Sequence, residues 1–173
     1  MKNLAIGAGA GASLMAIVMG SVVPAIQGFE GTRLQAYHDI GGILTVCSGH
    51  TGPDVVVNKV YTPNQCNTLT QQDAQKAASG VLRVSPQLIY HPMQLAAAIS
   101  FSYNVGVGTY DHSSVAAAFN VGNFIGGCND LLKYDNAGGK YSVGLHNRRV
   151  QEQSICLSTL TPKGLNNVAV ATN

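Results

Sequence analysis

The sequence has no tryptophan and little charge, since only 10% of its 173 residues are Asp, Glu, Lys or Arg. Ten Lys and Arg residues against eight Asp and Glu residues leave a net charge of +2, with no long basic run. Nucleic-acid-binding domains usually carry a clustered basic excess, so no nucleic acid is expected as a partner. Glutamate is the rarest charged residue and occurs only at positions 30 and 152.

Four cysteines are present, at positions 47, 66, 128 and 156, and none lies in a CxxC or another compact metal-binding spacing. We therefore expect no metal and no cofactor. An even number of cysteines behind an export-like N-terminus favours two disulfides in an oxidising compartment. Reduced, buried thiols are the alternative if the domain stays in the cytosol. Three connectivities are possible, and the spacing does not choose among them.

A run of twenty residues without charge, from Leu4 to Val23, follows Lys2. It is long enough to cross a bilayer as a helix, but glycine and alanine replace the leucine of a strong membrane helix, so insertion is weak. It could be a cleaved signal peptide, a permanent anchor or an anchor that later leaves the membrane. Cleavage after Ala25 would leave little chain before Glu30, which favours retention. A helix buried in the core is a further alternative, although each interior glycine costs about 1 kcal/mol relative to alanine.

Beyond residue 28 the pattern predicts an α+β domain, in which a small antiparallel β-hairpin precedes several helices. Strand-like runs at 34–38 and 44–48 flank a turn with two glycines. Helices are expected to begin at Thr62 and again at Thr70, because each offers an N-cap. Further helical segments are expected at 93–103, 114–119, 123–134 and 144–156, of which the first is central and buried.

Glu30, Asp39 and Thr45 follow the apolar run, with eight and five residues between them. Acid-catalysed glycoside cleavage needs a protonated carboxyl beside the leaving oxygen and a second carboxylate that activates water or stabilises the cationic sugar. Glu30 and Asp39 can supply these groups. The Thr45 hydroxyl can hold the attacking water, as in inverting enzymes with carboxyls about 6.5 to 9.5 Å apart. The alternatives are that Glu30 is a carboxylate on a helix surface, Asp39 a turn residue and Thr45 an ordinary strand residue.

Three ordered motifs make the pattern more specific. The segment FEGTRLQAYHDIGGILTVCSGHT at 29–51, SFSYNVGVG at 100–108, and AGGK at 137–140 with GLHNRRVQEQSIC at 144–156 resemble the T4-type bacteriophage lysozymes (glycoside hydrolase family 24). The motifs cover nearly the whole domain. The resemblance implies a mostly α-helical lysozyme-like fold and an N-acetylmuramidase that hydrolyses the β-1,4 bonds between N-acetylmuramic acid and N-acetylglucosamine in peptidoglycan, for host cell lysis.

The resemblance also implies roles for the site residues. Glu30 would be the general acid, Asp39 the second carboxylate, as base or nucleophile, and Thr45 the hydroxyl that positions water. Arg148 is placed against Glu30, where it would modulate the acidity of the Glu30 carboxyl or bind substrate. Arg149 could equally be a solvated arginine on a helix.

Further residues are assigned by the same resemblance. Asn104 and Tyr134 are candidates for substrate binding, although relatives usually have tryptophan where Tyr134 stands, which leaves substrate contacts there open. His50 and Asp73 are expected to form a structural ion pair. The expected disulfides are Cys47–Cys66 and Cys128–Cys156, with a free, redox-active Cys47 as the alternative.

The N-terminal run resembles the signal-anchor-release segments of some phage endolysins, which tether the enzyme inactive in the inner membrane until it escapes into the periplasm. The expected divisions are a signal-anchor at 1–28, a catalytic domain at 29–160 and a loosely ordered tail at 161–173. The expected partners are peptidoglycan and, through residues 4–23, the bacterial inner membrane, and a monomer is expected. The rival interpretations are a lytic transglycosylase and a non-catalytic wall-binding or membrane-disrupting protein.

Overall fold

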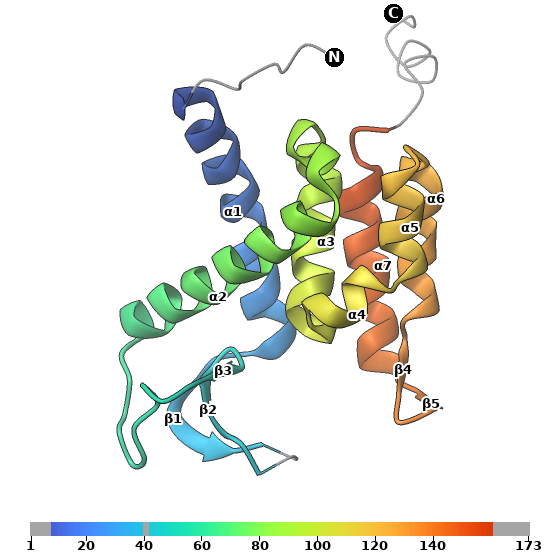
Figure 1. Cartoon of the computed structure of the whole chain (residues 1–173). Helices are drawn as coiled ribbons and strands as arrows, with labels where there is room; N and C mark the ends of the chain where they lie inside the picture. The colour runs from blue at the N-terminus through green and yellow to red at the C-terminus, as the bar shows by residue number, and fades with distance from the viewer. Residues whose placement is uncertain (1–7, 40–41, 161–173) are drawn as a thin grey trace, which may run out of the picture.

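One N-terminal helix leads into a small β-sheet, and helices make up most of the remaining chain (Figure 1). The structure is a computed structural model that describes residues 8–39 and 42–160. In chain order the elements are α1 (Ala8–Glu30), β1 (Arg33–His38), β2 (Leu44–Cys47), β3 (His50–Thr51), α2 (Pro63–Val84), η1 (Pro86–Tyr90), α3 (Pro92–Val105), α4 (Val107–Asp111), α5 (Ser114–Asn120), α6 (Phe124–Asp130), η2 (Leu131–Lys133), β4 (Asn136–Ala137), β5 (Lys140–Tyr141) and α7 (Val143–Leu157). The predicted α+β class is confirmed.

The small sheet has three antiparallel strands in the order β1–β2–β3. Strands β1 and β2 form the predicted hairpin, in which Tyr37 lies opposite Thr45 and His38 lies opposite Leu44. Gly42, before β2, has a φ of 77°, a conformation that glycine adopts without steric cost. The hairpin therefore brings the residue that follows β1, Asp39, back towards β2.

Helix α2 begins where the sequence predicts. The Thr62 hydroxyl accepts a hydrogen bond from the Gln65 amide at 3.2 Å, and the Gln65 side chain accepts one from the Thr62 amide at 2.8 Å. This is a reciprocal capping box. The predicted second start at Thr70 is wrong, because α2 continues through Thr70, which is buried. Its side chain faces the core, and tertiary packing outweighs the local capping preference there.

The predicted central helix is α3. All nine residues from Gln94 to Ser102 are buried, and α1, α2 and α7 each pack against this helix. The helix expected over 123–134 is shorter, since α6 ends at Asp130 and the 3-10 turn η2 comes next. The glycines of the AGGK motif form the turn between β4 and β5, where Gly138 and Gly139 both have positive φ.

Helix α1 contributes its inner face to the core of the domain. Val18 and Ile26 are fully buried, Val22 is 2% exposed, and the helix packs against α3 and α2. Gly20 and Gly28 of this helix lie outside its packed face, because a Cβ at either position would meet no atom within 4 Å. Apolar burial by the valines and isoleucine, at roughly 25 cal/mol per Å², thus offsets the glycine cost.

The helix runs through residue 28 without interruption, so the expected division at 28 and 29 falls inside one continuous element. None of the helices in the described ranges 8–39 and 42–160 combines the length and apolar character needed to cross a bilayer. The first seven residues and the expected tail at 161–173 lie outside the described residues.

Both expected disulfides are present. Cys47–Cys66 links β2 to α2, and Cys128–Cys156 links α6 to α7, with sequence separations of 19 and 28 residues. The alternative of a free Cys47 is therefore wrong for this structure. Loops of this length correspond to about 3 kcal/mol of stabilisation per disulfide in the chain-entropy model.

Close packing between α5 and α6 gives a first test. A Cβ on Gly127 would lie 2.5 Å from the ring of Phe119, which is fully buried. We expect Gly127→Ala to lower the free energy of unfolding by about 1–3 kcal/mol, because the ring has no space to move. Urea unfolding measures the change. Gly108→Ala in α4 is the control, since a Cβ there meets no atom within 4 Å, and equal losses in both variants would contradict the packing argument.

Candidate active site

Glu30 is the last residue of α1, and the turn after it is fixed by contacts with two other elements. Gly31 comes next with a φ of 67°, and its amide donates to the Gln27 carbonyl at 3.0 Å. The Gly31 carbonyl accepts a hydrogen bond from the Ser48 hydroxyl at 3.0 Å. The Ser48 carbonyl in turn accepts one from the Tyr103 hydroxyl of α3 at 2.8 Å. The position of Glu30 is thus tied to both the β-sheet and the central helix.

Arg148 of α7 contacts the Glu30 side chain directly, as an ion pair between its Nη1 and the Glu30 Oε1. Its Nη2 donates to the Ser100 carbonyl at 3.0 Å, and its Nε donates to the Glu152 carboxylate at 3.1 Å. Its guanidinium lies 4.9 Å from the ring centroid of Phe29. Arg148 is 4% exposed, whereas the Glu30 side chain is 30% exposed. The arginine is therefore held in the interior while the acid reaches solvent.

Glu152 is the residue of this cluster that the sequence analysis missed. It is fully buried and accepts hydrogen bonds from the Ser100 hydroxyl at 2.7 Å and from Arg148 and Arg149 at 3.1 Å each. Its spacing of four and three residues after the two arginines places all three on one face of a helix. That spacing, in a chain with only two glutamates, was the available signal.

Arg149 is fully buried, so its interpretation as a solvated arginine is wrong. Its Nη2 donates to the Asn104 side chain at 3.1 Å, and its guanidinium lies 4.9 Å from the Phe101 ring centroid. Its Nε lies 2.8 Å from the second oxygen of Glu152, close enough for an ion pair, although the angle is outside the range of a hydrogen bond. Two cations and two carboxylates thus balance across α1 and α7.

Burial shapes the protonation equilibria of this cluster. Loss of hydration raises the pKa of Glu152, and the neighbouring charges of Arg149 and Arg148 act in the opposite direction. Loss of hydration also lowers the pKa of Arg149, against the attraction of Glu152. Both shifts have the same cause, because loss of hydration disfavours the charged form of either group. A charge in this interior is therefore stable only beside its partner.

Asp39 and Thr45 are connected through the backbone of Ile43 at the end of the hairpin. The Ile43 amide donates to the Asp39 Oδ1 at 2.8 Å, and the Ile43 carbonyl accepts from the Asp39 amide at 3.0 Å and from the Thr45 hydroxyl at 2.9 Å. Among the described residues, this leaves the other oxygen of Asp39 for water or substrate. The Thr45 oxygen keeps its acceptor capacity, so it can still receive a hydrogen bond from a water.

Comparison with known proteins now identifies the family. Residues 27–152 match the family model described as phage lysozyme. The chain belongs to the phage lysozyme family. It is 35% identical over 160 residues to the SAR-endolysin of Enterobacteria phage PA-2, covering 90% of this chain and 94% of that protein. It is 38% identical over 133 residues to the SAR-endolysin of Bacteriophage PS119, covering 76% of this chain and 78% of that protein.

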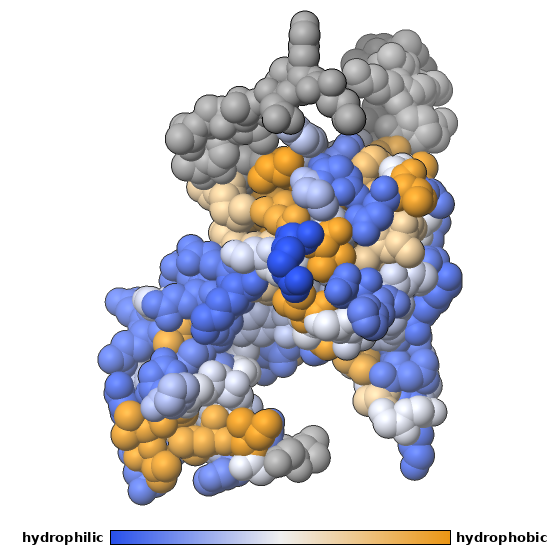
Figure 2. Space-filling view, in the orientation of Figure 1, coloured by the Kyte–Doolittle hydropathy of each residue, from blue (hydrophilic) through white to orange (hydrophobic). Residues whose placement is uncertain are grey.

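The fold is also that of solved structures of phage lysozymes. The active form of the P1 phage endolysin Lyz matches with a TM-score of 0.73 and 23% identity, over 88% of this chain and 96% of that one. This chain is a glycosidase of the lysozyme type. Figure 2 shows an opening in the surface between the β-sheet lobe and the lower end of the helices, where the β4–β5 hairpin projects.

The remaining candidates of this lysozyme-type site make contacts inside the protein. Tyr134 packs edge-on against Phe101, with ring centroids 4.9 Å apart, and its hydroxyl accepts from the Ser114 amide at 3.0 Å. Asn104 receives the hydrogen bond from Arg149. The contacts of Tyr134 and Asn104 are with other residues of the protein. Substrate binding by either residue therefore stays a prediction.

The expected contact between His50 and Asp73 is present. Its Nδ1 lies 2.6 Å from Asp73 and its Nε2 lies 3.1 Å from Asp54, which the sequence analysis did not include. The pKa of Asp54 is lowered by backbone hydrogen bonding and then by its hydrogen bond with His50. His50 is 3% exposed and joins the β-sheet to α2, as a residue that supports the fold.

The buried cluster gives the second test. Glu152→Gln would leave two buried arginines without their shared carboxylate, and loss of one partner of a buried ion pair costs about 3–5 kcal/mol. We expect the free energy of unfolding in urea to fall by that amount. Asp111→Asn removes an exposed carboxylate, whose side chain is 44% exposed, and should change stability little. A stable Glu152→Gln variant would show that Glu152 does not balance the arginines.

Proposed function

We propose that this lysozyme is an endolysin that hydrolyses the β-1,4 bonds between N-acetylmuramic acid and N-acetylglucosamine in bacterial peptidoglycan. Glu30 is the general acid, Asp39 the second carboxylate and Thr45 the residue that positions water. The observation that carries these roles is the arrangement of Glu30. It is partly exposed at the end of α1, while the buried Arg148 holds one of its carboxylate oxygens.

The chemistry derives from that arrangement. Because Arg148 contacts Oε1, the proton on Glu30 resides on the other oxygen, from which it passes to the glycosidic oxygen as the carbon–oxygen bond breaks. The charge that Glu30 acquires is stabilised by the guanidinium already in place, which is electrostatic preorganisation. Asp39 stabilises the positive sugar and either removes a proton from the water held by Thr45 or forms a bond to the sugar itself.

A lytic transglycosylase is the rival activity, since it uses one acid and an internal hydroxyl of the sugar in place of water. The paired Asp39 and Thr45, joined through Ile43, favour hydrolysis, because a transglycosylase has no water to position. Released muropeptides separate the two activities: hydrolysis gives reducing ends, and transglycosylation gives anhydro-muramic ends.

The third test removes the acid. Glu30→Gln keeps the size and hydrogen-bonding capacity of the side chain but cannot donate the proton, and positioned acid catalysis contributes about 10²–10⁴-fold to a rate. We expect the clearing rate of outer-membrane-permeabilised Gram-negative cells to fall by that factor. Asp111→Asn should clear them at the rate of the unmodified protein. Equal clearing by Glu30→Gln would overturn the enzymatic assignment and favour a wall-binding or membrane-disrupting protein.

We also propose that residues 4–23 first anchor the protein in the inner membrane, facing the periplasm, and that release into the periplasm activates it. The relatives named SAR-endolysin support this, as does the weak apolar character of the run. Val18 and Val22, which belong to the proposed anchor, cannot lie in a bilayer and in the core of the domain at once. In the anchored state Glu30 therefore lacks the packing of α1 that holds it against Arg148.

The fourth test changes the strength of the anchor. A Leu contributes roughly −0.3 to −0.6 kcal/mol to the free energy of membrane insertion and an Asp about +2.5 to +3.5 kcal/mol at a helix centre, so Leu in place of Gly9 and Gly11 strengthens insertion and Asp weakens it. We expect the leucine pair to keep protein in the membrane fraction and delay lysis, and the aspartate pair to abolish anchoring. Fractionation with an immunoblot measures both. Full lytic activity of the leucine pair from the membrane fraction would contradict activation by release.

A further inference from the structure

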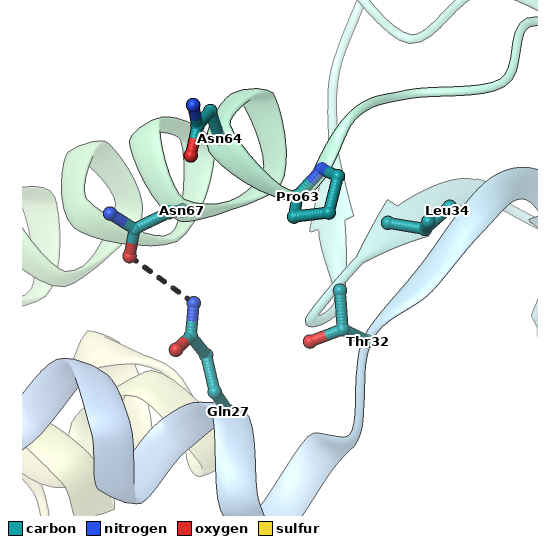
Figure 3. A pocket seen from close by; sticks show the side chains of 6 residues that line it. All are labelled: Gln27, Thr32, Leu34, Pro63, Asn64 and Asn67. Carbon is teal, nitrogen blue, oxygen red and sulfur yellow. Dashed lines mark hydrogen bonds between the residues drawn. The ribbon is translucent and has the colours of Figure 1, made fainter.

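A groove runs between α1 and α2 and is lined by residues other than those of the proposed catalytic site. It consists of two cavities of about 490 and 340 Å³, lined in part by the same two residues, Gln27 and Asn67. The Gln27 side chain donates a hydrogen bond to the Asn67 side chain at 3.3 Å, as Figure 3 shows. Neither Glu30, Asp39 nor Thr45 lines either cavity. We call the two cavities together the α1–α2 groove.

The two walls of the α1–α2 groove differ in chemistry. Helix α2 contributes three carboxamide side chains, those of Asn64, Asn67 and Gln71. The α1 wall presents mostly small or apolar residues, among them Gly20 and Val23, and Gln27 is its one carboxamide. At the end of the groove drawn in Figure 3, the wall opposite α2 continues beyond α1 into the start of β1.

A carboxamide both donates and accepts hydrogen bonds without carrying charge. The described residues that line the groove include no Asp, Glu, Lys or Arg. An ionised ligand would therefore find no oppositely charged side chain among them. The chemistry fits a neutral ligand that has hydroxyl groups, an amide and a small apolar group. The cavities also fall within roughly 300–1,000 Å³, the usual range for small-molecule sites.

We infer that the α1–α2 groove is a second carbohydrate site, which binds an N-acetylated amino sugar of a glycan strand. Such a sugar presents hydroxyls and an amide to the carboxamides and its acetyl methyl to the α1 wall. Stem peptides fit less well, because their carboxylates would find no cation there. The inference rests on the proposed function, which makes peptidoglycan the substrate. A second point of attachment raises the effective concentration of the catalytic site at the insoluble wall.

The groove also depends on the state of α1. One of its walls belongs to the helix that the proposed anchor removes from the domain, so the groove is complete only when α1 is packed. A ligand that binds only the packed arrangement stabilises it by linkage. Glycan binding in the groove would therefore favour the same arrangement that places Glu30 against Arg148.

The test uses the full chain in its released form, with Glu30→Gln so that the ligand is not cleaved. Tetra-N-acetylchitotetraose is titrated, and the side-chain amide signals of Asn64, Asn67 and Gln71 are followed by NMR. We expect saturable shifts of these signals. Asn64→Trp, which fills one cavity, should weaken binding at the groove at least tenfold, whereas Gln72→Trp, on α2 but outside the groove lining, should leave it unchanged. The deacetylated tetramer should not shift these signals.

Signals around Thr45 report the proposed cleft in the same titration. Shifts there that persist in Asn64→Trp show that the variant is folded and that the cleft binds independently. Shifts confined to the cleft, an unchanged groove affinity in Asn64→Trp, or equal binding of the deacetylated tetramer would each overturn the second site. Groove binding without any shift near Thr45 would instead count against the proposed cleft and leave the second site standing.

Discussion

The contact between Glu30 and Arg148 depends on α1 being packed against α3. The arginine comes from α7 and is held by Ser100 of α3 and by Glu152, and none of these residues belongs to α1. Helix α1 supplies the Glu30 carboxylate, and its position depends on the packing of Val18, Val22 and Ile26. The interior thus contains a buried cation, and the apolar face of one helix determines whether its carboxylate partner is present.

The β-hairpin places the other two site residues by a different means. Asp39 and Thr45 are coupled by three hydrogen bonds to the backbone of Ile43, so their relative position needs no particular side chain at 43. The Cys47–Cys66 disulfide and the His50–Asp73 pair then join the sheet to α2. Helices α1 and α2 both pack against α3. The Glu30 and Asp39 carboxylates are therefore both positioned relative to this central helix.

Local signals predicted much of this architecture. The capping box at Thr62 is complete within four residues, and the strand pattern around the Gly42 turn is likewise local, so both were readable from the sequence. The start expected at Thr70 was wrong because burial against the core, which no local pattern records, overrode a valid capping residue. The same limit explains Arg149: an arginine on a helix is usually solvated, and only the tertiary position of Glu152 and Asn104 makes its burial favourable.

The composition of the N-terminal run fits the two environments that the proposed activation requires. A leucine-rich segment would insert strongly and remain in lipid, and a polar one would never insert. Here Val18, Val22 and Val23 occupy the inward face of α1, whereas Gly20 lies at a position without packing neighbours. The residues that fill the core are therefore apolar enough for lipid, and the glycines lower the affinity for lipid without leaving cavities in the core. The proposed weak anchoring and the observed packing are compatible because they depend on different faces of one helix.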